Sequence, residues 1–160
     1  MSTAVHIDLP SQKLVLLESG RQLASYNISS AKNGVGTAQG SECTPRGEHR
    51  IRLKIGAGCP INTVFVGRRP TGELYSHELA GLYPDRDWIL TRILWLTGTQ
   101  PHVNRFGSCD TLKRFIYIHG TAQEALLGKA VSHGCIRLAN ADIIELFDAV
   151  NNNTPVFIQD

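Results

Sequence analysis

The chain has 160 residues, of which 42% are hydrophobic and 19% are charged, and its formal net charge is +2 at pH 7. These values are typical of a single globular domain over residues 1–160 and argue against a disordered chain. The small net charge and scattered basic residues argue against nucleic-acid binding, and no apolar run approaches the roughly 20 residues that membrane insertion as a helix requires.

The first residues have the alternation of a strand. Val5, Ile7 and Leu9 are apolar and are separated by the polar His6 and Asp8. The segment has no basic start, long apolar stretch or A-x-A site of an export signal, so a cytoplasmic location is expected. A periplasmic location is the alternative if a leader has been trimmed away.

Strands are predicted through most of the chain. Residues 14–17 and 23–28 flank the glycine-containing turn ESGR and predict a hairpin. Residues 50–55 alternate polar and apolar side chains strictly, which is typical of a strand with one buried face. Runs rich in β-branched and aromatic residues predict further strands at 63–66, 88–96 and 115–118, and residues 154–158 predict a closing strand.

Two helices are predicted, both late in the chain. Residues 121–128 open with the capping-box pattern T-x-x-E, from Thr121 to Glu124, and end at a glycine. The second helix is expected to begin at a cap on Asn140. Its apolar stripe has helical spacing and consists of Ile143, Leu146, Phe147 and Val150.

A long irregular segment separates these groups of elements. Residues 67–87 are rich in glycine, proline and charged residues, and such a loop in a compact domain is often a lid or binding element. A solvated excursion without a function is the alternative interpretation.

The sequence VSHGCIRL, residues 131–138, raises the main functional question, because Cys135 follows a His-Gly pair. A thiol becomes a strong nucleophile when a neighbouring imidazole takes its proton. His133 is close in sequence but Gly134 between them suggests a tight bend. We favour His119 as the base, since it ends a strand and Gly120 after it permits close backbone approach.

The same bend can supply other parts of a catalytic site. Consecutive N–H groups in the bend from Ser132 to Cys135 can converge on a developing oxyanion, and Arg137 can form a two-pronged contact with a carboxylate. A lone cysteine is usually a packed core residue. A metal site is a weaker alternative, because the four cysteines lack ligand-like spacing: Cys43, Cys59, Cys109 and Cys135.

Four motifs, in order, resemble the L,D-transpeptidase catalytic domain, also called the YkuD domain. The strongest is IHG followed by SHGCIRL, the family's active-site signature. The others are the opening hairpin at residues 7–29, TPRGEHRI at residues 44–51, and the closing helix and strand within residues 138–158.

The resemblance implies a mainly β, β-sandwich-like fold with two short helices and a cleft under a flap, which residues 67–107 would supply. It implies attack on a peptidoglycan stem tetrapeptide, at the bond between residue three, often diaminopimelate, and D-Ala. It implies no metal and no organic cofactor. By position, the implied roles are Cys135 as nucleophile, His119 as base, the Gly120 carbonyl to orient it, the Gly134 and Cys135 amides for the oxyanion, His133 to shape the pocket, and Ser132 and Arg137 for substrate.

Two fates are open to the resulting thioester. Water would give an L,D-carboxypeptidase acting on soluble muropeptides, which is expected for a cytoplasmic protein. An amine of a second stem peptide would give cross-links outside the membrane. A non-catalytic domain that binds cell-wall peptides or a partner protein is the alternative from a different class of function.

Overall fold

The computed structural model describes residues 2–160, and within them the chain forms ten strands, two α-helices and two short 3-10 turns. The mainly β prediction is confirmed. The elements in chain order are β1 (Thr3–Asp8), β2 (Lys13–Glu18), β3 (Arg21–Asn27), β4 (Gly47–Ile55), β5 (Thr63–Val66), β6 (Arg69–Leu74), α1 (His77–Leu82), β7 (Ile89–Gly98), β8 (Tyr117–Gly120), β9 (Ile136–Leu138), α2 (Asn140–Ala149) and β10 (Pro155–Gln159).

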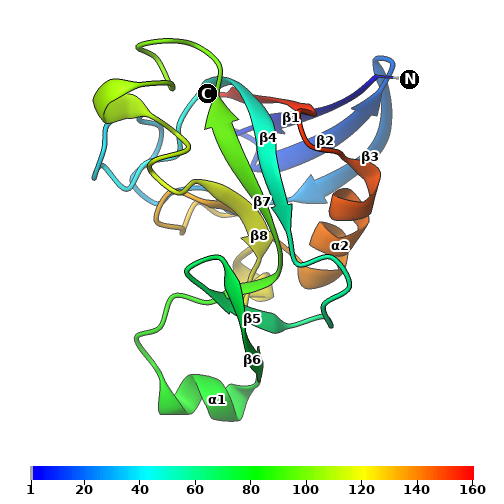
Figure 1. Cartoon of the computed structure of the whole chain (residues 1–160), viewed down its shortest axis with the longest axis vertical. Coiled ribbons are helices and arrows are strands. Elements are labelled where there is room, and N and C mark those ends of the chain that lie inside the picture. Colours follow the sequence, from blue (N-terminus) through cyan, green and yellow to red (C-terminus); the bar gives the residue numbers. More distant parts are fainter. Residues whose placement is uncertain (1) are drawn as a thin grey trace.

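All ten strands are linked into one mixed sheet that branches at β7. The path runs β3-β2-β1-β10-β4-β7-β5-β6, and β8 pairs with both β7 and β9. The pairs β1–β10 and β8–β9 are parallel, and the remaining pairs are antiparallel. Figure 1 shows β1, β2 and β3 on one side of the molecule and β5, β6 and α1 at the far end. The fold that was expected to be β-sandwich-like is therefore built from one connected sheet.

The predicted hairpin near the N-terminus is formed by β2 and β3. Ser19 and Gly20 both have positive φ angles, of 50° and 80°, which gives the tight turn between the strands. Leu14 and Leu16 of β2 are 0% and 3% exposed, so alternate residues face the core.

Helix α2 covers one face of the sheet, where it packs against β7 and β8. The four apolar residues predicted for its inner face are at most 4% exposed: Ile143, Leu146, Phe147 and Val150. The predicted cap is one residue late, since Ala139 precedes the helix and Asn140 is its first residue. The Asn140 side chain instead donates to the Thr121 carbonyl at 2.8 Å and accepts from Thr91 Oγ1 at 2.6 Å.

The prediction of a helix at residues 121–128 is wrong. Only a 3-10 turn, Glu124–Leu126, forms there. The Glu124 carboxylate accepts from the Asn140 backbone N–H at 3.2 Å and from its side-chain Nδ2 at 3.0 Å. The pattern read as a capping box therefore forms a long-range contact, which ties this turn to the start of α2.

The other helix lies in the segment 67–107, which was predicted as an insertion. α1 begins after Ser76, whose Oγ accepts from the Leu79 N–H at 3.0 Å. The same segment contains β7, a central strand whose Leu90, Ile93, Leu94 and Leu96 side chains are 0% exposed. The segment 67–107 is therefore not an insertion over its whole length, because it includes the central strand β7. The part that projects from the molecule is the β5–β6 end with α1 (Figure 1).

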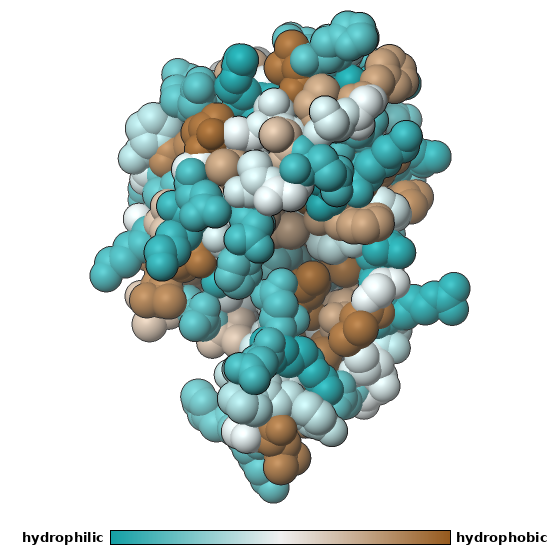
Figure 2. All heavy atoms as spheres, turned by 90° about the vertical axis from the view of Figure 1, so that its left-hand side faces the viewer, coloured by the Kyte–Doolittle hydropathy of each residue, from teal (hydrophilic) through white to brown (hydrophobic). Residues whose placement is uncertain are grey.

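The surface of the projecting part is mixed, since Val66, Leu74, Leu82 and Tyr83 are exposed among polar side chains. Figure 2 shows the main body above and this smaller part below, with hydrophobic side chains gathered in small groups rather than in one continuous area. Neither helix of residues 2–160 has the length and apolar composition needed to cross a membrane.

His49 of β4 is a buried, neutral part of the fold. It is 2% exposed, its Nδ1–H donates to the Gly47 carbonyl at 3.0 Å, and its Nε2 accepts from Thr111 Oγ1 at 2.9 Å. Burial lowers the pKa of His49 from 6.5 to about 4, because the charged imidazolium loses its hydration.

This burial predicts a loss of stability in mild acid. Between pH 6.5 and about pH 4 the unfolded chain binds a proton at residue 49 that the folded chain does not bind. The free energy of unfolding should therefore fall by up to about 3 kcal/mol over this window as the pH decreases, while the full stability is present above it. Urea unfolding at a series of pH values measures this slope.

The His49→Gln variant should show a flatter slope than the unmodified protein. His102→Asn is the matched control, because His102 is exposed and its φ of 66° is one that asparagine tolerates. Equal slopes for His49→Gln and the unmodified protein would contradict the prediction.

Candidate active site

The parallel pairing of β8 with β9 brings the predicted site residues together. His119 is opposite Arg137, and Ile118 is opposite Ile136. Both isoleucines are 0% exposed and belong to the main core, so the alternate residues His119 and Arg137 point to the other side. Cys135, which precedes β9 directly, lies on that side too.

These side chains line one cavity of about 110 Å³, here called the thiol cavity. Its lining residues are Asp87, Arg114, Phe115, Ile116, His119, Ser132, His133, Cys135 and Arg137. The structure thus brings Cys135, both candidate histidines and Arg137 into one space.

The Cys135 thiol is held in its neutral form. Its Sγ accepts from the Tyr117 backbone N–H at 3.3 Å and donates to the Phe115 carbonyl at 3.4 Å. Burial raises the pKa of Cys135 to about 12, against the opposing effects of the Tyr117 N–H, Arg137 and Arg114, which favour the thiolate. A neutral thiol is a weak nucleophile, so any attack by this sulfur would require a base to remove its proton.

The hydrogen bonding of His119 leaves one of its ring nitrogens free to accept a proton. The side chain is buried, and its Nδ1–H donates to the Gly120 carbonyl at 2.6 Å. A carbonyl can only accept, so the proton is fixed on Nδ1 and the lone pair of Nε2 is left to take another. Burial lowers the pKa of His119, which keeps the imidazole neutral and able to act as a base.

Glycine is required after this histidine. A Cβ atom on Gly120 would lie 2.7 Å from the Leu90 carbonyl oxygen and would collide with Asn140 Oδ1. The close backbone approach predicted for Gly120 is thus confirmed, and it explains how the carbonyl that holds His119 is itself positioned.

His133 differs from His119 in its surroundings. It is exposed at the rim of the thiol cavity, whereas His119 lies inside. An exposed imidazole without a fixed tautomer is a poorer candidate for the base, so the geometry favours His119.

The loop that carries the thiol is closed by Ser132. Its Oγ donates to the Cys135 carbonyl at 2.6 Å and accepts from the Gly134 N–H at 3.2 Å. Ser132 was expected to contact substrate and the Gly134 amide to face an oxyanion. In the structure these two groups are bonded to each other, and Ser132 also lines the thiol cavity. The Cys135 N–H donates to no acceptor within residues 2–160.

Gly134 takes a conformation that other residues rarely adopt. Its φ is +134°, and a Cβ atom there would lie 3.3 Å from both the Cys43 carbonyl oxygen and Ile116 Cδ1. Thr44 Oγ1 donates to the Gly134 carbonyl at 3.0 Å. The TPRG segment thus supports the SHGC loop from the side.

Arg114 is a site residue that the sequence did not reveal. Its guanidinium donates to the Gly36 carbonyl at 3.2 Å, to Ser41 Oγ at 3.3 Å and to the Cys43 carbonyl at 2.7 Å. It therefore fastens the loop of residues 36–43 beside the thiol cavity. No motif distinguishes this arginine from the other basic residues of the chain.

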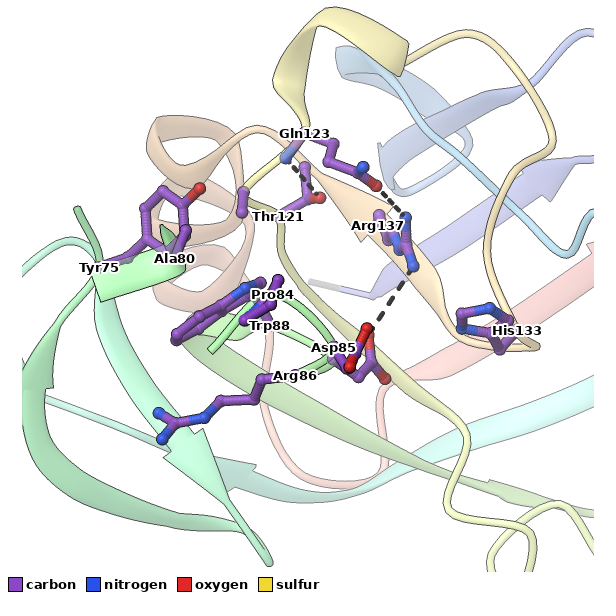
Figure 3. A pocket seen from close by; sticks show the side chains of 12 residues that line it. Tyr75, Ala80, Pro84, Asp85, Arg86, Trp88, Thr121, Gln123, His133 and Arg137 are labelled. Carbon is purple, nitrogen blue, oxygen red and sulfur yellow. Dashed lines mark hydrogen bonds and ion pairs between the residues drawn. The ribbon is translucent and has the colours of Figure 1, made fainter. Parts of the chain in front are cut away.

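Arg137 is buried but not fully paired. It is 8% exposed, and its Nη1 donates to Gln123 Oε1 at 3.0 Å. Its Nη2 lies 3.8 Å from Asp87 Oδ1, which was also not predicted as a site residue. Figure 3 shows Arg137 between Gln123 and the segment that carries Asp85, and a dashed line marks the contact of Arg137 with Asp87.

A larger hollow of about 360 Å³, here called the outer pocket, adjoins the thiol cavity. One wall comes from the projecting part, including Tyr75, Ala80, Arg86 and Trp88, and the opposite wall comes from residues 121–123 (Figure 3). A cleft under a flap supplied by residues 67–107 was expected. The residues of that segment that line this hollow lie within 75–88.

Metal-binding residues are not clustered in the part of the chain that the structure describes. Within residues 2–160, no three His, Cys, Asp or Glu side chains gather closely enough to hold a metal ion.

Fold and site together define a mainly β domain with a cysteine and a tautomer-fixed histidine in one cavity. The sequence profile of the YkuD domain, the L,D-transpeptidase catalytic domain, matches residues 2–158. The chain therefore belongs to the L,D-transpeptidase catalytic domain family.

Curated relatives match over a short stretch. The YkuD protein of Bacillus subtilis is 54% identical over 46 residues, which are 29% of this chain and 28% of that protein. The YqjB protein of the same species is 42% identical over 55 residues, or 34% of this chain and 31% of that protein. The matched region is thus under a third of either relative.

Solved structures share the fold over nearly the whole chain. An L,D-transpeptidase of Mycobacterium smegmatis superposes with a TM-score of 0.61 and 18% identity, over 99% of this chain and 59% of that one. L,D-transpeptidase 3 of Mycobacterium tuberculosis, in complex with a faropenem-derived adduct, gives 0.62 and 16% identity over 99% of this chain and 60% of that one. The chain spans about three fifths of these proteins.

The Ser132 bonds predict a measurable effect on stability. Ser132→Ala leaves the Gly134 N–H and the Cys135 carbonyl without their partner in a buried loop, so the free energy of unfolding should fall by about 1–3 kcal/mol. Urea unfolding measures the change. Ser25→Ala, which removes an exposed serine of β3, should change stability by less than about 0.5 kcal/mol, and an equally small effect at Ser132 would contradict the prediction.

Proposed function

We propose that this chain is a cysteine acyl-transfer enzyme that acts on peptidoglycan stem tetrapeptides. Cys135 attacks the carbonyl of residue three, D-Ala leaves, and a thioester forms on the enzyme. The observation that carries the proposal is the Nδ1 bond of His119, which leaves Nε2 free in the cavity that also holds the thiol. Membership of the L,D-transpeptidase family supports the choice of substrate.

The proposed first step moves one proton twice. His119 Nε2 takes the proton of the Cys135 thiol as Sγ bonds to the substrate carbonyl carbon. The imidazolium then gives the proton to the amine of D-Ala as the carbon–nitrogen bond breaks. The pKa of Cys135 is raised and that of His119 is lowered, so proton transfer is expected to accompany attack rather than precede it.

Other residues position the substrate in this proposal. The Cys135 N–H is the available donor for the oxyanion, since the Gly134 N–H is bonded to Ser132. Arg137 binds a substrate carboxylate through donors not used by Gln123, and His133 at the rim contacts the substrate or the intermediate.

The thioester is resolved by water or by an amine, and the first half-reaction is the same for both. Water gives a tripeptide, as expected of an L,D-carboxypeptidase, and the amine of a second stem peptide gives a cross-linked dimer. Hydrolysis and a cytoplasmic location remain predictions, which product analysis and cell fractionation test separately.

Incubation with a disaccharide-tetrapeptide, followed by mass spectrometry, tests the proposal. We expect loss of one D-Ala, with a tripeptide or a dimer as product. Cys135→Ala should abolish the reaction, and His119→Gln should slow it by roughly 100- to 10,000-fold, because the base is lost.

The control for these variants is Cys109→Ala, which removes a cysteine outside the thiol cavity and should keep the activity. A correctly folded protein that releases no D-Ala and forms no dimer would overturn the proposed function.

Reaction with a carbapenem separates an enzyme from a peptide-binding domain. The LD transpeptidase LdtMt1 was solved in complex with imipenem. We expect imipenem to acylate Cys135 alone among the four cysteines, as located by peptide mapping, and His119→Gln to slow labelling. Equally slow labelling of all four thiols would instead favour the non-catalytic domain.

A further inference from the structure

Asp87 lies where the outer pocket meets the thiol cavity. Within residues 2–160, three residues line both spaces: Asp87, His133 and Arg137. The Asp87 carboxylate is 3.8 Å from the Arg137 guanidinium, and 58% of the Asp87 side chain is exposed against 9% for Arg137. The Asp87 carboxylate and the Arg137 guanidinium therefore lie together where the two spaces meet.

Asp87 is also the one acid among the charged and titratable groups that face Cys135 within residues 2–160. These groups are Asp87, Arg114, Tyr117, His119, His133 and Arg137. Arg114 is occupied by its three acceptors in the loop of residues 36–43. Arg137 has only Gln123 and the distant Asp87 as side-chain partners, so it is the cation that can bind an incoming anion.

We propose that Asp87 is a specificity-determining residue, whose carboxylate competes with the acyl donor for Arg137 and so limits the preference of the site for anionic donors. The inference rests on the proposed function for the identity of the donor, but not for the competition itself. A donor carboxylate must displace Asp87 from Arg137 and approach its negative charge. A neutral donor meets neither obstacle.

The charge of Asp87 also acts on the nucleophile. A negative group beside the thiol opposes formation of the thiolate, and it is one of the causes of the raised pKa of Cys135. Removal of this charge at constant shape should therefore make Cys135 more reactive toward any electrophile, with the larger increase toward an anionic one.

Iodoacetate and iodoacetamide form a matched pair of probes, because they differ mainly in charge. In both reactions the Cys135 sulfur bonds to the CH₂ carbon, iodide leaves, and the thiol proton goes to His119 or to solvent. The ratio of the two rates at one fixed pH cancels the fraction of thiolate and reports the preference for an anion. Peptide mapping confines the measurement to Cys135, with the other cysteines as internal references.

In Asp87→Asn we expect the iodoacetate-to-iodoacetamide rate ratio at Cys135 to rise roughly threefold to tenfold, as for the loss of one partly screened charge. Glu78→Gln removes an exposed acid of α1 that lines neither space, so its ratio should match that of the unmodified protein. Asp87→Glu should restore a low ratio. An unchanged ratio in Asp87→Asn, with an unchanged melting temperature, would overturn the inference.

A second arm uses peptide donors. One tetrapeptide has a free side-chain carboxylate on residue three, and the other has this carboxylate amidated. In Asp87→Asn, the KM for the first peptide should fall relative to the KM for the second. If no protein turns over either peptide, the proposed function fails while the alkylation ratio still decides the role of Asp87. If both peptides are turned over with the same preference in both proteins, the inference about Asp87 fails alone.

Discussion

The parallel pairing of β8 with β9 is the constraint on which the rest of the site depends. Residues that are far apart in the chain become neighbours through it, since His119 faces Arg137 and the isoleucines beside them anchor both strands in the core. The far edge of β9 is also held, because Ser29 and Arg137 exchange both backbone hydrogen bonds at 3.0 and 2.9 Å. The reactive side chains are thus carried by backbone that has little freedom to move.

Hydrogen bonds made by the start of α2 help to position the carbonyl that binds the His119 imidazole. Asn140 at the start of α2 binds Thr91 of β7 and the Thr121 carbonyl just after β8, and it leaves no room for a side chain on Gly120. The Gly120 carbonyl in turn fixes the tautomer of His119. The helix therefore contributes to the chemistry although none of its residues lines the thiol cavity within residues 2–160.

The sequence was sufficient for the parts of the site that lie in contiguous motifs. That His119 and Cys135 share one cavity could be predicted, because strand ends and glycine bends such as Gly120 and Gly134 restrict where neighbouring side chains can point. Arg114 and Asp87 could not, since they come from loops whose positions depend on tertiary packing. The helix predicted at residues 121–128 failed for a related reason: Glu124 has the spacing of a capping residue, but its partner, Asn140, is distant in the chain.

The group that orients His119 is the neutral Gly120 carbonyl rather than a carboxylate, and this affects how the resting Cys135 thiol reacts with oxidants. The Tyr117 N–H, Arg137 and Arg114 favour the thiolate, but burial outweighs them, and the resting sulfur stays protonated. Peroxide attacks thiolates far faster than thiols. In the proposed mechanism the thiolate forms only as the substrate is attacked, so the resting sulfur should react slowly with peroxide, in a fold whose other thiols lie outside the thiol cavity.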